Sequence, residues 1–421
     1  MLDMLQRKAF EYFLHETNPA NGLVVDRTQD SAPASIAAVG FALAAYPVGV
    51  EHGWITRTEA AERTLTTLRF FWNSPQGTEP AATGYKGFYY HFLDMQTGRR
   101  AGTCELSTVD TALLLAGMLT AAMYFDQDSE GEQEICRLAD ALYRRVDWQW
   151  AQNRAATVTL GWKPEYGFMK HRWKGYDESL LLYVLGLGSP TYPLPKESYA
   201  AFTSTYFWKE VYGYEFLYGG SLFLHQFPHL WIDFRGIQDA FMREKGIDYF
   251  ENSRRATHVQ QQYAIANPYS FVGYGPHVWG LTASDGPGRT VRKICGVKRR
   301  FFGYRSRGVP DGPDDGTVAP WAVVSSLPFA PEIVLPTLNH FQAAYPAIMG
   351  TYGLKSGLNL TFSGNAPGKP DWISPHAYGI NLGPIVLACE NTRSGLLWRL
   401  IRSCPYFFIG LRRAGFINGW L

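Results

Sequence analysis

Residues 107–125, STVDTALLLAGMLTAAMYF, hold one carboxylate and no basic residue, so a helix formed here is apolar on nearly every side. Such a helix must be covered all round by other elements, and a chain of 421 residues is long enough to do this. The next segment, 130–146, carries apolar residues at helical spacing on one face and charges on the other. The pair therefore predicts a buried inner helix with an amphipathic outer partner.

The same alternation continues along the chain. An apolar stripe at Leu5, Ala9, Tyr12 and Phe13 predicts a first helix. Further helices are predicted at 35–50, ending near Pro47, at 56–73 behind an N-cap at Thr56, and at 178–188, 237–267, 331–345, 384–391 and 394–403. Alternating inner and outer helices are typical of an α-helical toroid, so we expect an all-α fold.

Long loops separate some of these helices. Residues 268–320 are rich in Gly, Pro and aromatic residues, which indicates functional loops, and residues 91–102 and 301–308 are candidates for short strands. No linker divides the chain, so we expect a single domain over residues 1–421.

Charge and cysteine content exclude several classes of protein. The formal net charge is +2 and the longest basic run is KRR at 298–300, which disfavours a nucleic-acid binder. The five cysteines are widely spaced and predict neither a disulfide framework nor a metal site. No apolar run reaches the length of a membrane span, and the N-terminus as written lacks the apolar region of a secretion signal. We expect a periplasmic protein if a signal was removed, and otherwise a cytoplasmic one.

Aromatic residues make up 15% of the chain, and many stand in loops beside polar groups, as in GYKGFYYHF, RWKGYD and YGPHVWG. Rings next to polar groups suit a cleft for a sugar, whose C–H face stacks on them. Packing within the protein explains any single ring equally well.

Carboxylates lie beside the apolar helices. Cleavage of a glycosidic bond needs one carboxylic acid to protonate the leaving oxygen and a second group to activate water. Asp110 stands at the start of the helix at 107–125, where it either stabilises the helix start or lines a site. Asp177 and Glu178 precede another apolar helix, and neighbouring side chains on a helix point about 100° apart. One of the two can therefore cap the helix while the other faces a cleft.

Two further segments group polar residues. In 219–239, His225 and His229 have the spacing of a metal pair, but Pro228 between them disfavours the helix that this spacing needs, so no metal is expected. In 371–384, Asp371, His376 and Asn381 precede the last helices. The chain has no G-x-S-x-G elbow, phosphate-binding loop or dinucleotide fingerprint.

Six segments resemble a known family: STVDTALLLAG, GYDESLLLYVLGLGSPTYPLP, YGGSLFLHQFPHLWIDFRGIQD, VWGLTASDGP, DGTVAPWAVVSSLPFAPE and LGPIVLACENTRSGLLW. The chain is similar over nearly its whole length to the bacterial glycoamylase family. That family includes endo-β-1,2-glucanases and sophorose-releasing enzymes, and is related to the transglycosylase region of cyclic β-1,2-glucan synthases. The resemblance implies an (α/α)6 barrel with a cleft at one end, an oligo- or polysaccharide substrate, no cofactor and an inverting acid/base mechanism.

The resemblance also assigns roles to residues. Glu178 is implied as the general acid, and Asp110, in the family's V-[ED]-T segment, lines the same pocket; Asp110 and Asp371 are the candidates for the base. The residues expected to bind substrate are His91, Trp173, Tyr176, Tyr218, Gln226, His229, Asp233, Arg235, Asp239, Tyr274, His277, Trp279 and Asp285.

Two positions depart from the family's pattern. Ser107 stands where several relatives carry an aspartate, and Asn381 stands in the I-D-x-G-P segment where many have aspartate. An amide cannot act as a base, so three alternatives to β-1,2-glucan hydrolysis stay open: sugar transfer, another β-glucan linkage, and an inactive carbohydrate-binding protein. A structural scaffold is less favoured because it does not need aromatic, Asp-rich loops.

Overall fold

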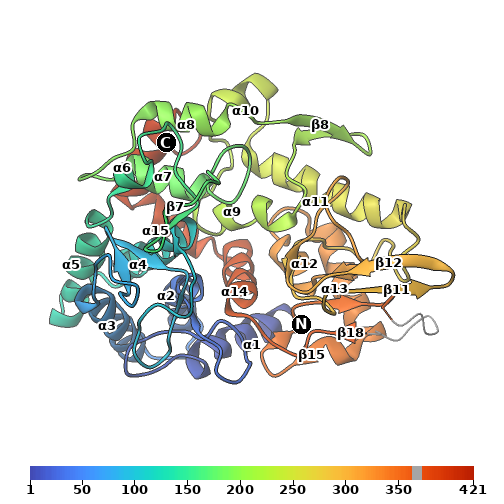
Figure 1. Ribbon diagram of the computed structural model, residues 1–421, viewed down its shortest axis with the longest axis horizontal. Coiled ribbons are helices and arrows are strands. Elements are labelled where there is room, and N and C mark those ends of the chain that lie inside the picture. The colour runs from blue at the N-terminus through green and yellow to red at the C-terminus, as the bar shows by residue number, and fades with distance from the viewer. Residues whose placement is uncertain (363–371) are drawn as a thin grey trace.

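The structure, a computed structural model, describes residues 1–362 and 372–421. The longer helices are α1 (Leu2–His15), α2 (Ile36–Glu51), α3 (Arg57–Asn73), α4 (Thr108–Tyr124), α5 (Glu130–Arg144), α7 (Leu180–Gly188), α8 (Lys196–Thr203), α11 (Tyr249–Ala266), α13 (Pro331–Ala344), α14 (Gly379–Arg393) and α16 (Pro405–Arg413). The shorter ones are α6 (Trp148–Ala151), α9 (Phe227–Trp231), α10 (Ala240–Lys245), α12 (Pro320–Ser325) and α15 (Leu396–Arg402), with 3-10 turns at Leu222–His225 and Pro346–Ile348. Helices dominate the molecule, and short strands lie mainly among the loops (Figure 1).

The strands are mostly two to five residues long. They are β1 (Ala34–Ser35), β2 (Gly84–Tyr85), β3 (Phe88–Tyr90), β4 (Phe92–Leu93), β5 (Leu106–Ser107), β6 (Gly161–Lys163), β7 (Gly167–Phe168), β8 (Trp208–Val211), β9 (Tyr214–Leu217), β10 (Ala283–Ser284), β11 (Thr290–Ile294), β12 (Val297–Phe301), β13 (Arg305–Ser306), β14 (Thr317–Val318), β15 (Met349–Gly350), β16 (Gly353–Leu354), β17 (Leu358–Asn359) and β18 (Trp372–Ile373). The largest sheet has the order β2-β3-β5-β6-β7.

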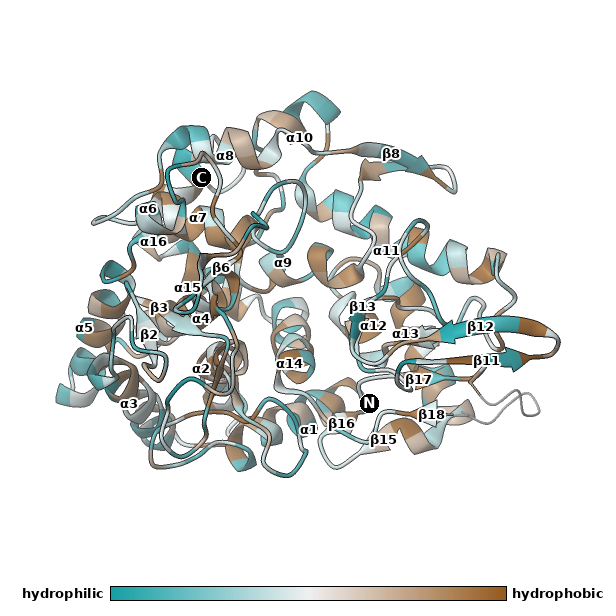
Figure 2. Ribbon diagram, in the orientation of Figure 1, coloured by the Kyte–Doolittle hydropathy of each residue, from teal (hydrophilic) through white to brown (hydrophobic). Residues whose placement is uncertain are grey.

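The two most apolar long helices, α2 and α4, pack so closely that their backbones are in contact. Nearly every residue of α2 and α4 is buried. A Cβ on Gly117 would lie 2.0 Å from the carbonyl oxygen of Gly40, so no larger residue fits between the helices there. The predicted inner helix at 107–125 is therefore confirmed, and α3 and α5 cover this pair with their amphipathic faces. Figure 2 shows the contrast between the hydrophobic α4 and the more hydrophilic outer helices.

Strands lead directly into inner helices. β1 runs into α2, β5 into α4, and β14 is followed by α12. Ser35 and Ser107 end their strands and cap the helices that follow, accepting hydrogen bonds from the N–H groups of Ala38 and Asp110. α14 packs against α1, α2 and α12. These junctions place the starts of several helices near one another.

Some predicted elements need correction. The helix predicted at 237–267 is two helices, α10 and α11, because the chain turns at Gly246 in a left-handed conformation and Asp248 caps α11. Pro47 lies within α2 rather than at its end, and α14 starts at Gly379, well before Pro384. The helix predicted at 178–188 begins at Leu180, which leaves Glu178 in the preceding turn. Pro228 lies in the first turn of α9, a position that proline tolerates.

Candidate active site

A cavity of about 410 Å³ opens where helix starts and loops meet. α2, α4 and α14 contribute residues from their first turns or N-caps, and Glu178 precedes α7. The lining residues are Asp26, Arg27, Ser35, His91, Phe92, Val109, Asp110, Glu178, Phe223, Phe227, Ala283, Tyr304, Ser306, Trp321, Tyr378, Ile380 and Asn381. Helix N-termini carry partial positive charge, so this arrangement favours groups that bear or develop negative charge.

Glu178 is the carboxyl group in the cavity whose proton is held most strongly. Burial, followed by the charges of Asp110 and Asp177, raises the pKa of Glu178 to about 8, although His91 opposes this shift. Its carboxyl group is therefore protonated at neutral pH. A protonated carboxyl at the edge of a cavity is what a general acid requires.

The neighbouring Asp177 has a different task. Its Oδ1 accepts hydrogen bonds from the backbone N–H of Ser179, at 2.9 Å, and from the Ser179 hydroxyl. Burial raises the pKa of Asp177 to about 6, while these hydrogen bonds limit the shift. Asp177 thus stabilises the turn before α7, and Glu178 is the one of the pair that lines the cavity.

Asp110 lies in the first turn of α4, where a carboxylate stabilises the helix start, and it also lines the cavity. The Ser107 hydroxyl donates a hydrogen bond of 2.5 Å to its Oδ2, and His91 Nδ1 lies 3.6 Å from the same oxygen. His91 Nδ1 also lies 2.9 Å from Glu105 Oε1. Burial acts to lower the pKa of His91, but Asp110 and Glu105 outweigh it and raise the pKa to about 9. A cationic imidazolium therefore stands among carboxylates in this wall.

The opposite wall is formed by the loop around Tyr304. Burial, followed by the charges of Asp26, Tyr378, Glu178 and Asp110, raises the pKa of Tyr304. The side chain is half exposed, and its ring lies 5.7 Å from that of Tyr378. With Phe92 and Phe223, which are partly exposed, these rings supply faces on which a sugar can stack.

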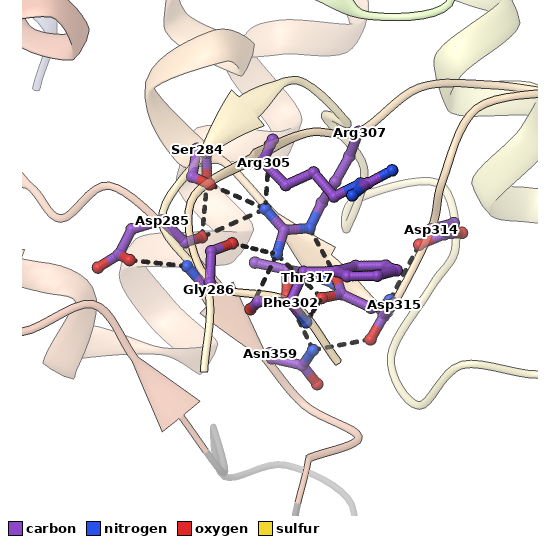
Figure 3. A network of polar contacts seen from close by, with 12 residues as sticks. Ser284, Asp285, Gly286, Phe302, Arg305, Arg307, Asp314, Asp315, Thr317 and Asn359 are labelled. Atoms are coloured by element: carbon purple, nitrogen blue, oxygen red, sulfur yellow. Dashed lines mark hydrogen bonds and ion pairs between the residues drawn. The ribbon is translucent and has the colours of Figure 1, made fainter. Parts of the chain in front are cut away.

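A buried ion pair holds this loop in place (Figure 3). Arg307 and Asp315 are fully buried and form two hydrogen bonds of 2.7 and 2.9 Å. The Arg307 guanidinium also donates to the Ser284 carbonyl oxygen at 2.9 Å and to the Gly303 carbonyl oxygen at 3.3 Å, which ties β10 to the residue before Tyr304. Asp315 Oδ2 accepts from the backbone N–H of Phe302. The ion pair thus positions the aromatic wall.

Of the residues predicted from the sequence, the cavity brings together Glu178, Asp110 and His91. Asp371 lies outside the described residues. The remaining candidates do not line the cavity: Trp173, Tyr176, Tyr218, Gln226, His229, Asp233, Arg235, Asp239, Tyr274, His277, Trp279 and Asp285.

Several of these side chains are bonded within the protein instead. Gln226 Nε2 donates to the Ala322 carbonyl oxygen at 2.7 Å, and Trp279 Nε1 donates to Thr337 Oγ1 at 2.9 Å. Asp239 accepts from the hydroxyls of Tyr199 and Tyr249. Polar and aromatic residues that support a loop produce the same sequence pattern as those that line a cleft, so the pattern did not separate them.

Sequence reasoning missed Asp26, Arg27, Tyr304 and Tyr378. Asp26 directly follows the apolar run LVV, and an acid at the end of a buried segment was the available signal.

No group of three or more His, Cys, Asp or Glu residues that could hold a metal occurs in the described parts of the chain. Within the same parts, no helix is long and apolar enough to cross a membrane.

Comparisons with known proteins identify relatives of this chain in sequence and in structure. The family model Glycoamylase, described as "Putative glucoamylase", matches residues 170–405. The exo β-1,2-glucooligosaccharide sophorohydrolase (non-reducing end) of Parabacteroides distasonis is 27% identical over 98% of the chain, which spans 57% of that relative's length.

Two crystal structures are similar over almost their whole length. A "putative glucoamylase" of Bacteroides uniformis is 31% identical, with a TM-score of 0.87, covering 100% of this chain and 98% of the other. The endo-β-1,2-glucanase of Chitinophaga pinensis, solved with sophorotriose and glucose, is 26% identical, with a TM-score of 0.86 and the same coverage.

Proposed function

Because the chain belongs to the Glycoamylase family, we propose that it is a glycoside hydrolase that cleaves β-1,2-glucan or its oligosaccharides. The named activities of the relatives from Parabacteroides distasonis and Chitinophaga pinensis support this substrate class. We further propose that the chain is one domain and that its helices form the (α/α)6 toroid of the family, with the cavity at the end where the helices start. One observation carries the proposal: Glu178, whose pKa is raised to about 8, lies in a cavity lined by aromatic residues and is protonated there at neutral pH.

In this mechanism Glu178 protonates the leaving glycosidic oxygen. The ring faces of Tyr304 and Phe92 bind sugar units, and the imidazolium of His91 holds the pKa of Glu105 below its usual value. A second carboxylate activates water on the opposite side of the anomeric carbon, which inverts its configuration. Asp110 is the predicted base that lies within the described residues, and it lines the same cavity as Glu178.

The test is incubation with linear β-1,2-glucan while reducing ends and product sizes are followed. The wild type is expected to release reducing sugar, and Glu178→Gln to lose nearly all of this activity. Glu210→Gln, an exposed carboxylate on β8, serves as the matched control and retains activity. No product from the wild type on β-1,2-glucans of any length would refute the proposal.

Asn381 favours one second function, sugar transfer, because the residue at this position of the wall is an amide, which cannot act as a base. Transfer conserves the number of reducing ends while product sizes change. The same incubation therefore separates hydrolysis from transfer.

A further inference from the structure

Asp26 is a carboxylate in the cavity that the mechanism above does not use. Its pKa is raised by burial, and the remaining influences are the charges of Arg27, His91 and Asp110; no hydrogen bond contributes. Within residues 1–362 and 372–421, no side-chain or backbone donor binds its carboxylate oxygens, whereas Asp110, Glu105 and Asp177 each have a partner. Asp26 is therefore free to accept a proton or a hydrogen bond from a ligand in the cavity.

The backbone places Asp26 beside the start of α14. Arg27 and Tyr378 form an antiparallel bridge, and the Gly379 N–H donates to the Asp26 carbonyl oxygen at 3.0 Å. Asn381 lies two residues after Gly379, and its side chain lines the same cavity. Residues more than 350 positions apart in the chain thus form one corner of the site.

Asn381 supplies a second, independent sign of a ligand in this corner. The residue is 2% exposed, and its Nδ2 donates to Ser356 Oγ at 3.0 Å, which fixes the orientation of the amide. Its Oδ1 is buried and has no hydrogen-bond donor among the described residues. A buried acceptor without a donor is unfavourable, so this oxygen is suited to accept a hydrogen bond from a water or a sugar hydroxyl that enters the cavity.

We propose that Asp26 is the base of the reaction, removing a proton from the attacking water, and that Asn381 Oδ1 orients this water by accepting a hydrogen bond from it. This inference rests on the proposed hydrolase function and deepens it.

Asp110 suits this task less well because its carboxylate is already engaged. Its Oδ2 receives the Ser107 hydroxyl and faces His91, and its side chain is 9% exposed. A base needs an unoccupied lone pair directed at the water within hydrogen-bond reach. Among the described residues, neither carboxylate oxygen of Asp26 has a hydrogen-bond donor, so both are available to the water.

The chemical step is balanced. The water oxygen forms a bond to the anomeric carbon while the Asp26 carboxylate takes one of the water's protons. The glycosidic C–O bond breaks, its electron pair stays on the leaving oxygen, and that oxygen receives the Glu178 proton. Asp26 then releases its proton to solvent and Glu178 takes one up, so the net reaction adds one water across the bond.

The experiment compares Asp26→Asn and Asp26→Ala with Asp30→Asn, an exposed aspartate on the same loop. Both Asp26 variants are expected to lose about 10²–10⁴-fold in kcat with a small change in KM, as for loss of a general base, while Asp30→Asn keeps wild-type activity. Azide needs no base, so it is expected to restore turnover to Asp26→Ala and to give an α-configured glucosyl azide. Thermal melting checks that each variant is folded.

The outcomes separate the two proposals. An active wild type with more than a tenth of kcat left in Asp26→Asn overturns the role of Asp26 alone. A folded Asp26→Ala variant that stays inactive in azide overturns it too, because its role is then not that of a base. A wild type that yields no product from β-1,2-glucans of any length refutes the hydrolase function, and the base role with it.

Discussion

The two walls of the cavity differ in what holds their residues in place. The wall with Asp110, Glu178 and Asn381 stands on helix starts, and behind it α2 and α4 touch at Gly40 and Gly117 with no room to shift. The wall with Tyr304 stands on the short loop between β12 and the two-residue β13, and the Arg307–Asp315 pair holds it. The proposed acid Glu178 thus lies just before a helix start, the proposed base Asp26 lies on a loop that is hydrogen-bonded to the start of α14, and a sugar-stacking ring lies on the Tyr304 loop.

This division has a physical reason. Proton transfer tolerates little change in distance, so its groups gain from helices fixed by close packing. Stacking on a sugar depends on area and tolerates small displacements. Changes to the first wall are therefore expected to alter kcat, and changes to the second to alter KM or stability.

The largest effect is expected at Glu178, on the rigid wall. Glu178→Gln is expected to lower kcat/KM by about 10³-fold or more, because the leaving oxygen loses its proton donor. In the wild type only the protonated form is active, so kcat/KM falls as pH rises through about 8, the pKa of Glu178. A pH profile measures this basic limb. If Glu178→Gln kept the same limb, another group would be the acid.

The next effect is expected at the ion pair of the loop wall. Arg307→Met leaves Asp315 as an unpaired buried charge, and breaking such a pair costs about 3–5 kcal/mol of unfolding free energy. Urea unfolding measures the loss, with Arg300→Met on the exposed face of β12 as the control. The double variant Arg307→Met/Asp315→Leu is expected to recover much of the stability, because it removes both charges. No recovery would show that the hydrogen bonds to the loop carbonyls matter more than the charges.

A smaller effect is expected at Tyr304, which the ion pair positions. Tyr304→Ala removes a stacking face worth about 0.5–1.5 kcal/mol, so KM is expected to rise about 2- to 10-fold with little change in kcat. Tyr304→Phe keeps the ring and is the matched control, with KM near that of the wild type. Steady-state kinetics on sophoro-oligosaccharides measures both. A fall in kcat as large as that of Glu178→Gln would place the Tyr304 hydroxyl in the chemistry.

The smallest effect is expected at Ser107, where the rigid wall begins. Ser107→Ala removes the N-cap of α4 and is expected to cost about 1 kcal/mol of stability. Ser107→Asp restores a cap at this position but adds a charge beside Asp110, so it is expected to keep stability only partly. Thermal melting distinguishes the two variants. An unchanged melting temperature in Ser107→Ala would mean that packing of α4 alone holds the helix start.

Local patterns predicted much of the helical frame. The apolar residues of α4, the Thr56 cap of α3 and the amphipathic spacing of α5 were readable because each depends on residues close in sequence. The basic hairpin β11–β12, which projects in Figure 1, was missed because its strands carry charges instead of alternating apolar residues. The break between α10 and α11 was missed because Gly246 and Asp248 are also tolerated within helices.

The sequence by itself determined which segments are buried helices, and its resemblance to the family predicted that Glu178 and Asp110 line one pocket, as they do. Without the resemblance, the residue pattern left open which of Asp177 and Glu178 faces the cavity, because the hydrogen bonds from the Ser179 N–H and hydroxyl to Asp177 make the difference. It could not join Asp26 to Asn381 or Arg307 to the wall of Tyr304 either. These contacts connect distant segments and arise only when the helices pack. The tertiary structure alone therefore decided that Arg307 is buried and bonded within the protein, and that Asp26 lines the cavity without a hydrogen-bond donor among the described residues.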